Sequence, residues 1–349
     1  MQLEAIAATA YAAAAVVTLW CARRRELHRL KPDGRHTVLV TGTTGWLGAR
    51  LAERLAASGD IRVIGLARHP CTIPGVINVL GDLSTGEGFS TLKKIGNIDA
   101  CVHLAGVAGW CTLAQGLSVN VQGTQRVFTA LTDDVDGVLR CAKFVVASSI
   151  AAVGTGIPNH PPEQVPMPDT HPYAGFPWPY ALSKAMVEQV CKLLVAQEER
   201  LDVLLLRIGC CITDPPMPPL HLETGIGQAY PVQPAALSAP PPTDPCFPEG
   251  PLAVIAESDI VRCLELAARA PHTPGVRTVN VTARHAFVQG GTSVPQLLRK
   301  WYGEQANAID MSHYERPGTE QDWMYDCSAV ERELGFTPSI DVRMRYKLK

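Results

Sequence analysis

The chain has 349 residues, 46% of them hydrophobic, and can bury a sizeable core as one large domain or two closely joined ones. Its formal net charge of -2 gives no sign of the basic character typical of nucleic-acid-binding proteins and argues against nucleic acid as a partner. Eleven cysteines, an odd number without metal-type spacing, favour a reducing compartment that faces the cytosol. We therefore expect neither a metal nor nucleic acid.

The N-terminal segment, residues 1–33, is predicted to be a membrane anchor and linker. Ala5 to Ala22 is uncharged, reaches the length of a spanning helix and is followed by three arginines, Arg23 to Arg25. Arginines on that side predict a catalytic domain on the cytosolic face of the endoplasmic reticulum or another organelle. The alternative is an alanine-rich soluble helix or a targeting peptide, with a soluble cytoplasmic protein.

From His36 onward, short apolar segments alternate with helical patterns. Such alternation predicts an α/β fold with a doubly wound parallel sheet, a Rossmann domain over residues 34–212. A helix is predicted from Trp46 to about Ala57. The predicted strands are 36–41, 61–67, 76–80, 100–104, 144–147 and 203–208.

Residues 213–349 are predicted to form a smaller, interleaved substrate-binding region. Residues 214–251 contain twelve prolines, which exclude a regular helix or central strand and indicate a partly ordered lid. Periodicity returns with a predicted helix at 258–270, a strand at 278–281 and a helix at 294–301.

A glycine-rich turn follows the first predicted strand. Gly42, Gly45 and Gly48 leave backbone room for a dinucleotide pyrophosphate, and the positive end of the helix favours that anion. The amides of Trp46 and Leu47 are the predicted donors, and Thr44 completes the predicted site. A turn of purely structural purpose is the alternative.

The end of the second strand bears on the choice between NADP and NAD. An acidic residue there holds the ribose 2′-hydroxyl of NAD, whereas an arginine accommodates the 2′-phosphate of NADP. This strand ends in Arg68 and His69 without an acid, and Arg50 lies close enough in sequence to assist. We predict NADP, with NAD as the alternative, because a solvated surface arginine would give the same pattern.

Several later segments occur in the order typical of one enzyme family. They are 81–83, 103–106, 119–124, 147–154, 180–184, 257–261 and 326–338. With the glycine-rich turn, they make the chain resemble the extended short-chain dehydrogenase/reductase family, also described as the NAD-dependent epimerase/dehydratase type, from about His36 to about Arg345.

The resemblance implies further cofactor contacts. Asp82 and Leu83 would meet the adenine. Leu104, Ala105 and Gly106 would form the turn under the cofactor, and Ile208 would contact it from the end of its strand. The family also often forms homodimers through the two helices beside the active-site strand.

Tyr180 and Lys184 carry the predicted chemistry. Four residues apart, they share one face of a helix, and a nearby ammonium lowers the pKa of a phenol so that it can exchange a proton at neutral pH. The resemblance adds that Lys184 grips the nicotinamide ribose. An exposed helical pair is the alternative.

Two more residues complete the predicted catalytic set. Ser149 would hydrogen-bond the substrate oxygen during hydride transfer, with Ser148 as a rival. Asn120 resembles the supporting asparagine of the family, although a helix-cap role fits as well.

The neighbours of Ser149 narrow the reaction. No acid follows it, so dehydration is not expected. Residues 207–215 are locally similar to uronate dehydrogenases. However, Ile150, Ala151 and Cys210 stand where that subgroup has asparagine, histidine and serine, and a sugar acid would meet unpaired apolar surface.

The predicted pocket is instead apolar, formed by residues 107–113, 150–153 and a stretch near Leu220. We therefore predict an alcohol–ketone oxidoreductase for a hydrophobic substrate of the sterol, lipid or isoprenoid kind. The alternatives are an epimerase or dehydrogenase of a sugar or nucleotide sugar, and a non-catalytic NAD(P)-binding regulator or scaffold. Apolar residues that simply pack the core would give the same pattern.

Overall fold

The computed structural model describes residues 33–109, 111–156, 159–214, 253–284, 293–320 and 322–341. The predicted membrane anchor and nearly all of the predicted lid lie outside these residues. Among the helices that the structure describes, none has both the length and the apolar character needed to span a membrane.

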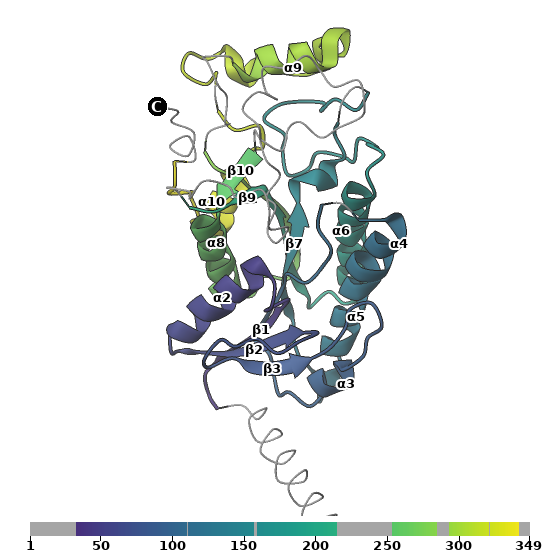
Figure 1. Cartoon of the computed structure of the whole chain (residues 1–349), viewed down its shortest axis with the longest axis vertical. Coiled ribbons are helices and arrows are strands. Elements are labelled where there is room, and N and C mark those ends of the chain that lie inside the picture. The colour runs from purple at the N-terminus through teal and green to yellow at the C-terminus, as the bar shows by residue number, and fades with distance from the viewer. Residues whose placement is uncertain are drawn as a thin grey trace, which may run out of the picture.

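Seven parallel strands form the central sheet (Figure 1). Their order is β3-β2-β1-β4-β7-β8-β11. The chain moves outward from β1 in one direction and then resumes at β4 in the other, which confirms the predicted doubly wound fold. The strands are β1 (His36–Thr41), β2 (Ile61–Ala67), β3 (Ile77–Leu80), β4 (Ala100–His103), β7 (Lys143–Ser149), β8 (Asp202–Ile208) and β11 (Gly275–Val281).

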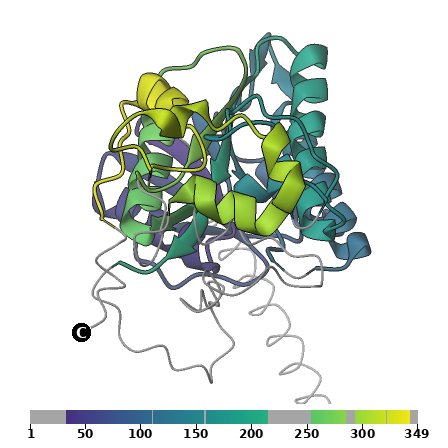
Figure 2. The same ribbon diagram turned by 90° about the horizontal axis from the view of Figure 1, so that it is seen from above.

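Helices cover both faces of this sheet, as Figures 1 and 2 show. One face carries α2 (Trp46–Ala57), α8 (Glu257–Arg269) and α10 (Ser328–Leu334). The other carries α3 (Phe89–Leu92), α5 (Gln122–Leu131) and α6 (Pro179–Gln197). Because the inner strands are covered on both sides, β1, β4, β7 and β8 are almost entirely buried.

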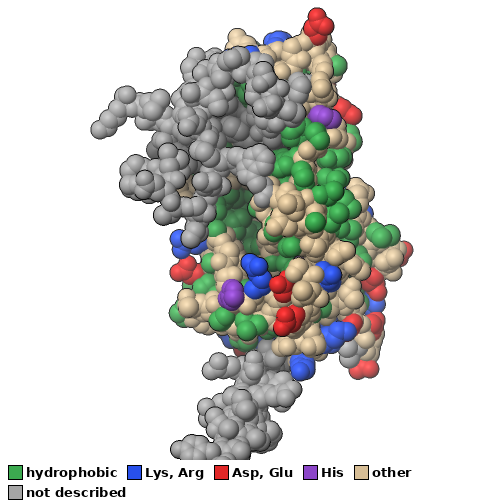
Figure 3. All heavy atoms as spheres, turned by 45° about the vertical axis from the view of Figure 1, so that its right-hand side comes forward, with side chains coloured by type: hydrophobic (Ala, Val, Ile, Leu, Met, Phe, Trp, Pro, Cys, Tyr) green, Lys and Arg blue, Asp and Glu red, His purple; other side chains and the backbone are tan. Residues whose placement is uncertain are grey.

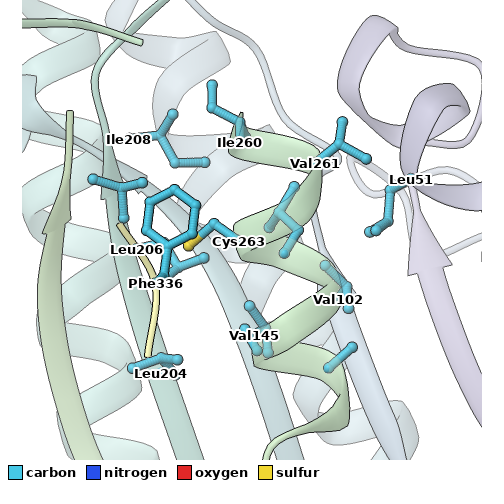
Figure 4. Packing of buried hydrophobic residues seen from close by; sticks show 14 of the residues in the cluster. Leu51, Val102, Val145, Leu204, Leu206, Ile208, Ile260, Val261, Cys263 and Phe336 are labelled. Atoms are coloured by element: carbon cyan, nitrogen blue, oxygen red, sulfur yellow. The ribbon is translucent and has the colours of Figure 1, made fainter. Parts of the chain in front are cut away.

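Each face of the sheet has its own hydrophobic cluster. On the α8 side, Leu204 and Leu206 of β8 pack with Cys263 of α8 and with Phe336 (Figure 4). On the other side, Phe128 of α5 stacks on Phe144 of β7, with ring centroids 3.9 Å apart. These contacts hold the carboxyl ends of the central strands in fixed positions.

A third cluster joins the segment after β7 to the C-terminal part of the chain. Val165 and Met167 pack with Leu298 and Tyr325, and the Val165 amide donates to the Asp310 carbonyl. The elements of this part are β10 (Val254–Ala256), paired with β9 (Cys210–Ile212), then α9 (Val294–Tyr302), η4 (Gly303–Ala308) and η5 (Ser312–Glu315). The C-terminal residues are thus interleaved with earlier segments, as predicted.

The remaining described elements are short. They are α4 (Leu113–Gln115), the π-helix η1 (Gly116–Val121), the hairpin strands β5 (Asp134–Val135) and β6 (Val138–Leu139), and the 3-10 helix η2 (Ile150–Val153). Of the predicted elements, 36–41, 61–67 and the helix from Trp46 agree with the structure at both ends. β7, β8 and β11 are one to three residues longer at an end than predicted, because strand pairing extends past the apolar run. β3 and β4 are one residue shorter, and α8 and α9 differ by one residue at one or both ends.

Candidate active site

The glycine-rich turn lies where β1 meets α2. Gly42 has a φ of 79°, and an added Cβ on Gly48 would lie 2.1 Å from the Gly42 carbonyl oxygen. A larger residue at Gly48 would therefore separate the helix from the turn. Gly45 is the N-cap of α2, and because glycine has no side chain the helix start has no side-chain capping hydrogen bond. The amides of Trp46 and Leu47 thus begin a helix without a side-chain cap, which suits a pyrophosphate.

The predicted adenosine end of the site contains Arg68, Asp82 and Leu83. Arg68 directly follows β2 and is exposed. The Ser84 hydroxyl and amide both donate to the Asp82 carboxylate, at 2.6 and 2.7 Å, and these bonds, with a smaller contribution from Arg68, lower the pKa of Asp82. Arg50, which was expected to assist Arg68, is instead paired with α8, because its Nε donates to Glu257 at 2.8 Å.

The turn after β4 is fastened to the end of β1. The amides of Leu104 and Ala105 both donate to the Thr41 hydroxyl, at 3.1 and 3.0 Å. An added Cβ on Gly106 would lie 2.8 Å from Asn120 Oδ1. These bonds keep the turn close to the glycine-rich loop, where the resemblance places the cofactor.

Ser149 and Ser148 end β7 and have different partners. The Ser148 hydroxyl donates to Glu188 Oε1 of α6 at 2.6 Å, so it is committed to the protein interior. The Ser149 hydroxyl accepts from the Ala151 amide at 3.2 Å, and the part of the chain that the structure describes holds no acceptor for its own proton. This difference favours Ser149 over Ser148 as a substrate-binding group.

Tyr180 and Lys184 lie in the first two turns of α6. The Lys184 ammonium is 5.9 Å from the centre of the Tyr180 ring, and it donates to the Ala147 carbonyl of β7 at 2.7 Å. Burial lowers the pKa of Lys184 to about 8, although nearby Glu188 opposes that effect. Because Ala147 lies two residues before the last residue of β7, the Lys184 ammonium is near the carboxyl end of that strand.

Asn120 does not cap a helix; it lies inside the π-helix η1. Its amide donates to the Val107 carbonyl at 3.0 Å and to Ser183 Oγ at 2.9 Å, and its Oδ1 accepts from the Val107 amide at 2.9 Å. The side chain therefore ties the turn after β4 to α6, one residue from Lys184. Ile208 ends β8 beside Ser149, its partner in the pairing of β7 with β8.

The segments predicted to line an apolar pocket differ in their exposure to solvent where the structure describes them. Residues 107–109 and 111–113 are half-buried or exposed. Ile150 and Val153 are buried in the third cluster, and Ala151 and Ala152 are 2% exposed, so this run packs the core. The stretch near Leu220 lies outside the described residues. On the face seen in Figure 3, hydrophobic side chains gather in the upper half of the molecule. The segment 150–153 therefore gives no support to a hydrophobic substrate.

Sequence reasoning missed Glu188 and Arg207. They form a buried ion pair with Arg207 Nη2 2.8 Å from Glu188 Oε2, and both side chains are less than a tenth exposed. A signal was present, because Glu188 continues the spacing of four from Tyr180 and Lys184.

A family model described as the NAD-dependent epimerase/dehydratase family matches residues 38–211. Over these residues the chain belongs to that family. The match covers the glycine-rich turn and every predicted catalytic residue. The family match therefore supports an NAD(P)-dependent enzyme of the oxidoreductase type.

Individual relatives are distant. UDP-glucose 4-epimerase 2 of Oryza sativa is 27% identical over 201 residues, which are 50% of this chain and 45% of that protein. The chain spans about half the length of the curated relatives it matches.

Two solved structures show a similar fold. A short-chain dehydrogenase/reductase superfamily protein from Agrobacterium tumefaciens, with bound NAD, is 22% identical, with a TM-score of 0.60 over 89% of this chain and 95% of that one. A mutated uronate dehydrogenase is 20% identical, with a TM-score of 0.54 over 89% and 84%.

Proposed function

We propose that the protein interconverts an alcohol and a carbonyl on a sugar or nucleotide sugar by hydride transfer, with NADP(H) as its cofactor. One observation carries this proposal. The Lys184 ammonium lies 5.9 Å from the centre of the Tyr180 ring and donates to the carbonyl of Ala147, two residues before Ser149 at the carboxyl end of β7.

In this proposal the cofactor, when bound, supplies or accepts the hydride. Tyr180 gives its phenolic proton to the substrate oxygen in reduction and takes it back in oxidation. The Lys184 ammonium stabilises the phenolate that is left behind. Ser149 donates a hydrogen bond to the same oxygen, where negative charge develops. Asn120 links the turn after β4 to α6 through Val107 and Ser183, and so fixes the position of that turn beside the site.

The substrate class is supported by similarity. The rice relative is a UDP-glucose 4-epimerase, and one structural neighbour is a uronate dehydrogenase. The hydrophobic substrate that we first expected has lost the support of the buried Ile150 and Val153. The same chemistry yields either a dehydrogenase, with net turnover of cofactor, or an epimerase, which oxidises and then reduces one carbon without net turnover.

The preference for NADP(H) is supported by Arg68, the exposed side chain directly after β2. Arg50, which we expected to assist, is paired with Glu257 instead. The homodimer and the membrane anchor on a cytosolic face stay predictions.

The decisive experiment compares the full-length protein with Tyr180→Phe. Purified protein would be incubated with NADPH or NADP and a panel of keto-sugars, sugars, UDP-sugars and, as a contrast, hydrophobic ketones. Cofactor absorbance and product chromatography would be followed together. We expect turnover on a sugar or UDP-sugar and a loss of about 10²–10⁴-fold in Tyr180→Phe.

The outcomes separate the alternatives. Sugar isomers formed without net change in absorbance indicate an epimerase. Turnover restricted to hydrophobic ketones restores the first expectation. Equal rates for both proteins contradict the proposed mechanism, and cofactor binding without any turnover supports a regulator or scaffold.

A further inference from the structure

Glu188 is a buried carboxylate with three strong hydrogen bonds. It lies on α6 with 2% of its surface exposed. Arg207 of β8 donates to both of its oxygens, at 2.9 and 2.8 Å, and the Ser148 hydroxyl of β7 donates at 2.6 Å. An ion pair of this kind strongly fixes orientation, although its net contribution to stability is small because both charges lose their hydration.

These bonds close a ring that contains Lys184. Lys184 and Glu188 are one helical turn apart on α6. On the neighbouring strand their partners are adjacent residues, since Lys184 donates to the Ala147 carbonyl and Glu188 accepts from Ser148. One hydrogen bond thus joins Lys184 to Ala147, and a second joins Glu188 to Ser148, so that α6 and β7 are linked at two neighbouring points. A change in the hydrogen bond between Glu188 and Ser148 would therefore also shift the Lys184 amine relative to the Ala147 carbonyl.

We propose that Glu188, held by Arg207 and Ser148, is a positioning residue that sets the place and the charge of the Lys184 amine. The proposal rests on the proposed function, because Lys184 matters there as the partner of Tyr180. It adds a role for a buried ion pair outside the proton-transfer residues themselves.

The charged and titratable groups around Lys184 agree with this role. On α6 they are Glu188, Cys191 and Tyr180; Cys111 faces it from the loop after β4, and His103 from β4 itself. Burial raises the pKa of the Cys191 and Cys111 thiols, so both are neutral at pH 7. Burial lowers the pKa of His103 to about 3, so it is neutral too. Among the described residues, Glu188 is therefore the negative charge that faces the amine.

The first experiment measures the pKa of Lys184 without turnover. Full-length protein free of added cofactor would be treated with brief pulses of acetic anhydride across pH 6–11, with acetylation of Lys184 followed by mass spectrometry. Only the neutral amine reacts, so the midpoint gives its pKa. We expect a midpoint near 8 for the natural protein. Glu188→Gln keeps the shape but removes the charge, and should lower the midpoint by about one unit.

Asp202→Asn is the matched control. Asp202 is a fully buried carboxylate at the other end of β8, paired with Arg277. Its loss should destabilise the sheet without changing the Lys184 midpoint. The proposal is overturned if Glu188→Gln keeps the natural midpoint, or if Asp202→Asn shifts it equally.

Ser148→Ala tests the ring if Glu188→Gln does not fold. This change breaks one hydrogen bond and leaves the ion pair intact. We expect Lys184 to be acetylated at least about three times faster at pH 8, since its geometry is less restrained, while Asp202→Asn keeps the natural rate. An unchanged rate in Ser148→Ala overturns the ring. None of these acetylation measurements uses a substrate. A failure of this proposal can therefore be distinguished from a failure of the proposed function, which the Tyr180→Phe comparison tests by turnover.

Discussion

A single exposed arginine governs the proposed cofactor choice. Arg68 follows the last residue of β2, and the carboxylate of Asp82, whose pKa is lowered by Ser84 and by Arg68, lies nearby. A 2′-phosphate beside Arg68 would add a charge-assisted hydrogen bond, which is worth more than a neutral one. Arg50 is unsuited to share this role because Glu257 and Glu53 both pair with it.

Arg68→Ala should weaken NADPH binding about 10- to 100-fold, as expected for loss of one hydrogen bond to a charged group. NADH binding should change less than about twofold, because that cofactor has no 2′-phosphate. Fluorescence titration with both cofactors would measure this. Arg54→Ala, which removes an exposed arginine of α2 that is paired with Glu265 of α8, should alter neither affinity. Equal losses for the two cofactors in Arg68→Ala would refute the assignment.

At the scale of elements, His103 fastens β4 to β1 and to the start of α5. Thr41 already accepts two amide protons, so its own hydroxyl proton must go to His103 Nδ1, at 2.8 Å. His103 Nε2 therefore carries the ring proton and donates to Thr124, at 3.1 Å, whose hydroxyl donates to the Asn120 carbonyl at 2.6 Å. Every donor in this chain has one acceptor, and a second ring proton would break it.

Protonation of His103 should therefore destabilise the folded protein. Burial lowers its pKa to about 3 in the folded state, from about 6.5 when unfolded. Between these values the unfolded chain binds a proton that the folded chain does not, so stability falls as pH drops from 6.5 towards 3. The contribution is about 1 kcal/mol per pH unit. Urea denaturation at pH 7, 6, 5 and 4 would measure it.

His103→Gln serves as the control for this pH dependence. It lacks the titrating ring, so its stability should fall less steeply over the same range, whatever its stability at pH 7. Parallel slopes for the two proteins would mean that other groups cause the loss.

For the molecule as a whole, the C-terminal segment is held on α8 by one buried carboxylate. Asp259 accepts from the amides of Ser339 and Ile340, both at 2.9 Å, and from the Ser339 hydroxyl and Arg262. Burial alone would raise the pKa of Asp259, but these hydrogen bonds outweigh it and the pKa lies below its usual value. Phe336, in the same segment, completes the cluster shown in Figure 4.

Asp259→Asn should loosen this segment, since an amide replaces one acceptor oxygen by a donor that faces other donors. We expect a loss of about 1–3 kcal/mol in the free energy of unfolding. Amide hydrogen exchange should become faster at Ser339 and Ile340, while β1 and β4 keep their protection. Asp310→Asn changes an exposed carboxylate that serves only a local turn, and its unfolding midpoint should stay unchanged. Uniformly faster exchange in Asp259→Asn would indicate general destabilisation instead.

Local patterns in the sequence were sufficient to predict the sheet, the glycine-rich turn and the shared helix face of Tyr180 and Lys184. These follow from local rules: apolar runs pair as strands, glycines permit the turn at Gly42, and a spacing of four places two side chains on one helix face. Family resemblance then singled out Ser149 and Asn120 as supporting residues.

The partners of these residues, in contrast, could be known only from the folded chain. It committed Ser148 to Glu188, placed Ile150 and Val153 in the core, and drew Arg50 to Glu257. Each outcome depends on an element distant in sequence, and local patterns carry no information about such packing. The physical reason is that hydrogen bonds and burial are settled by which strands and helices become neighbours, and the doubly wound sheet makes neighbours of residues far apart in the chain.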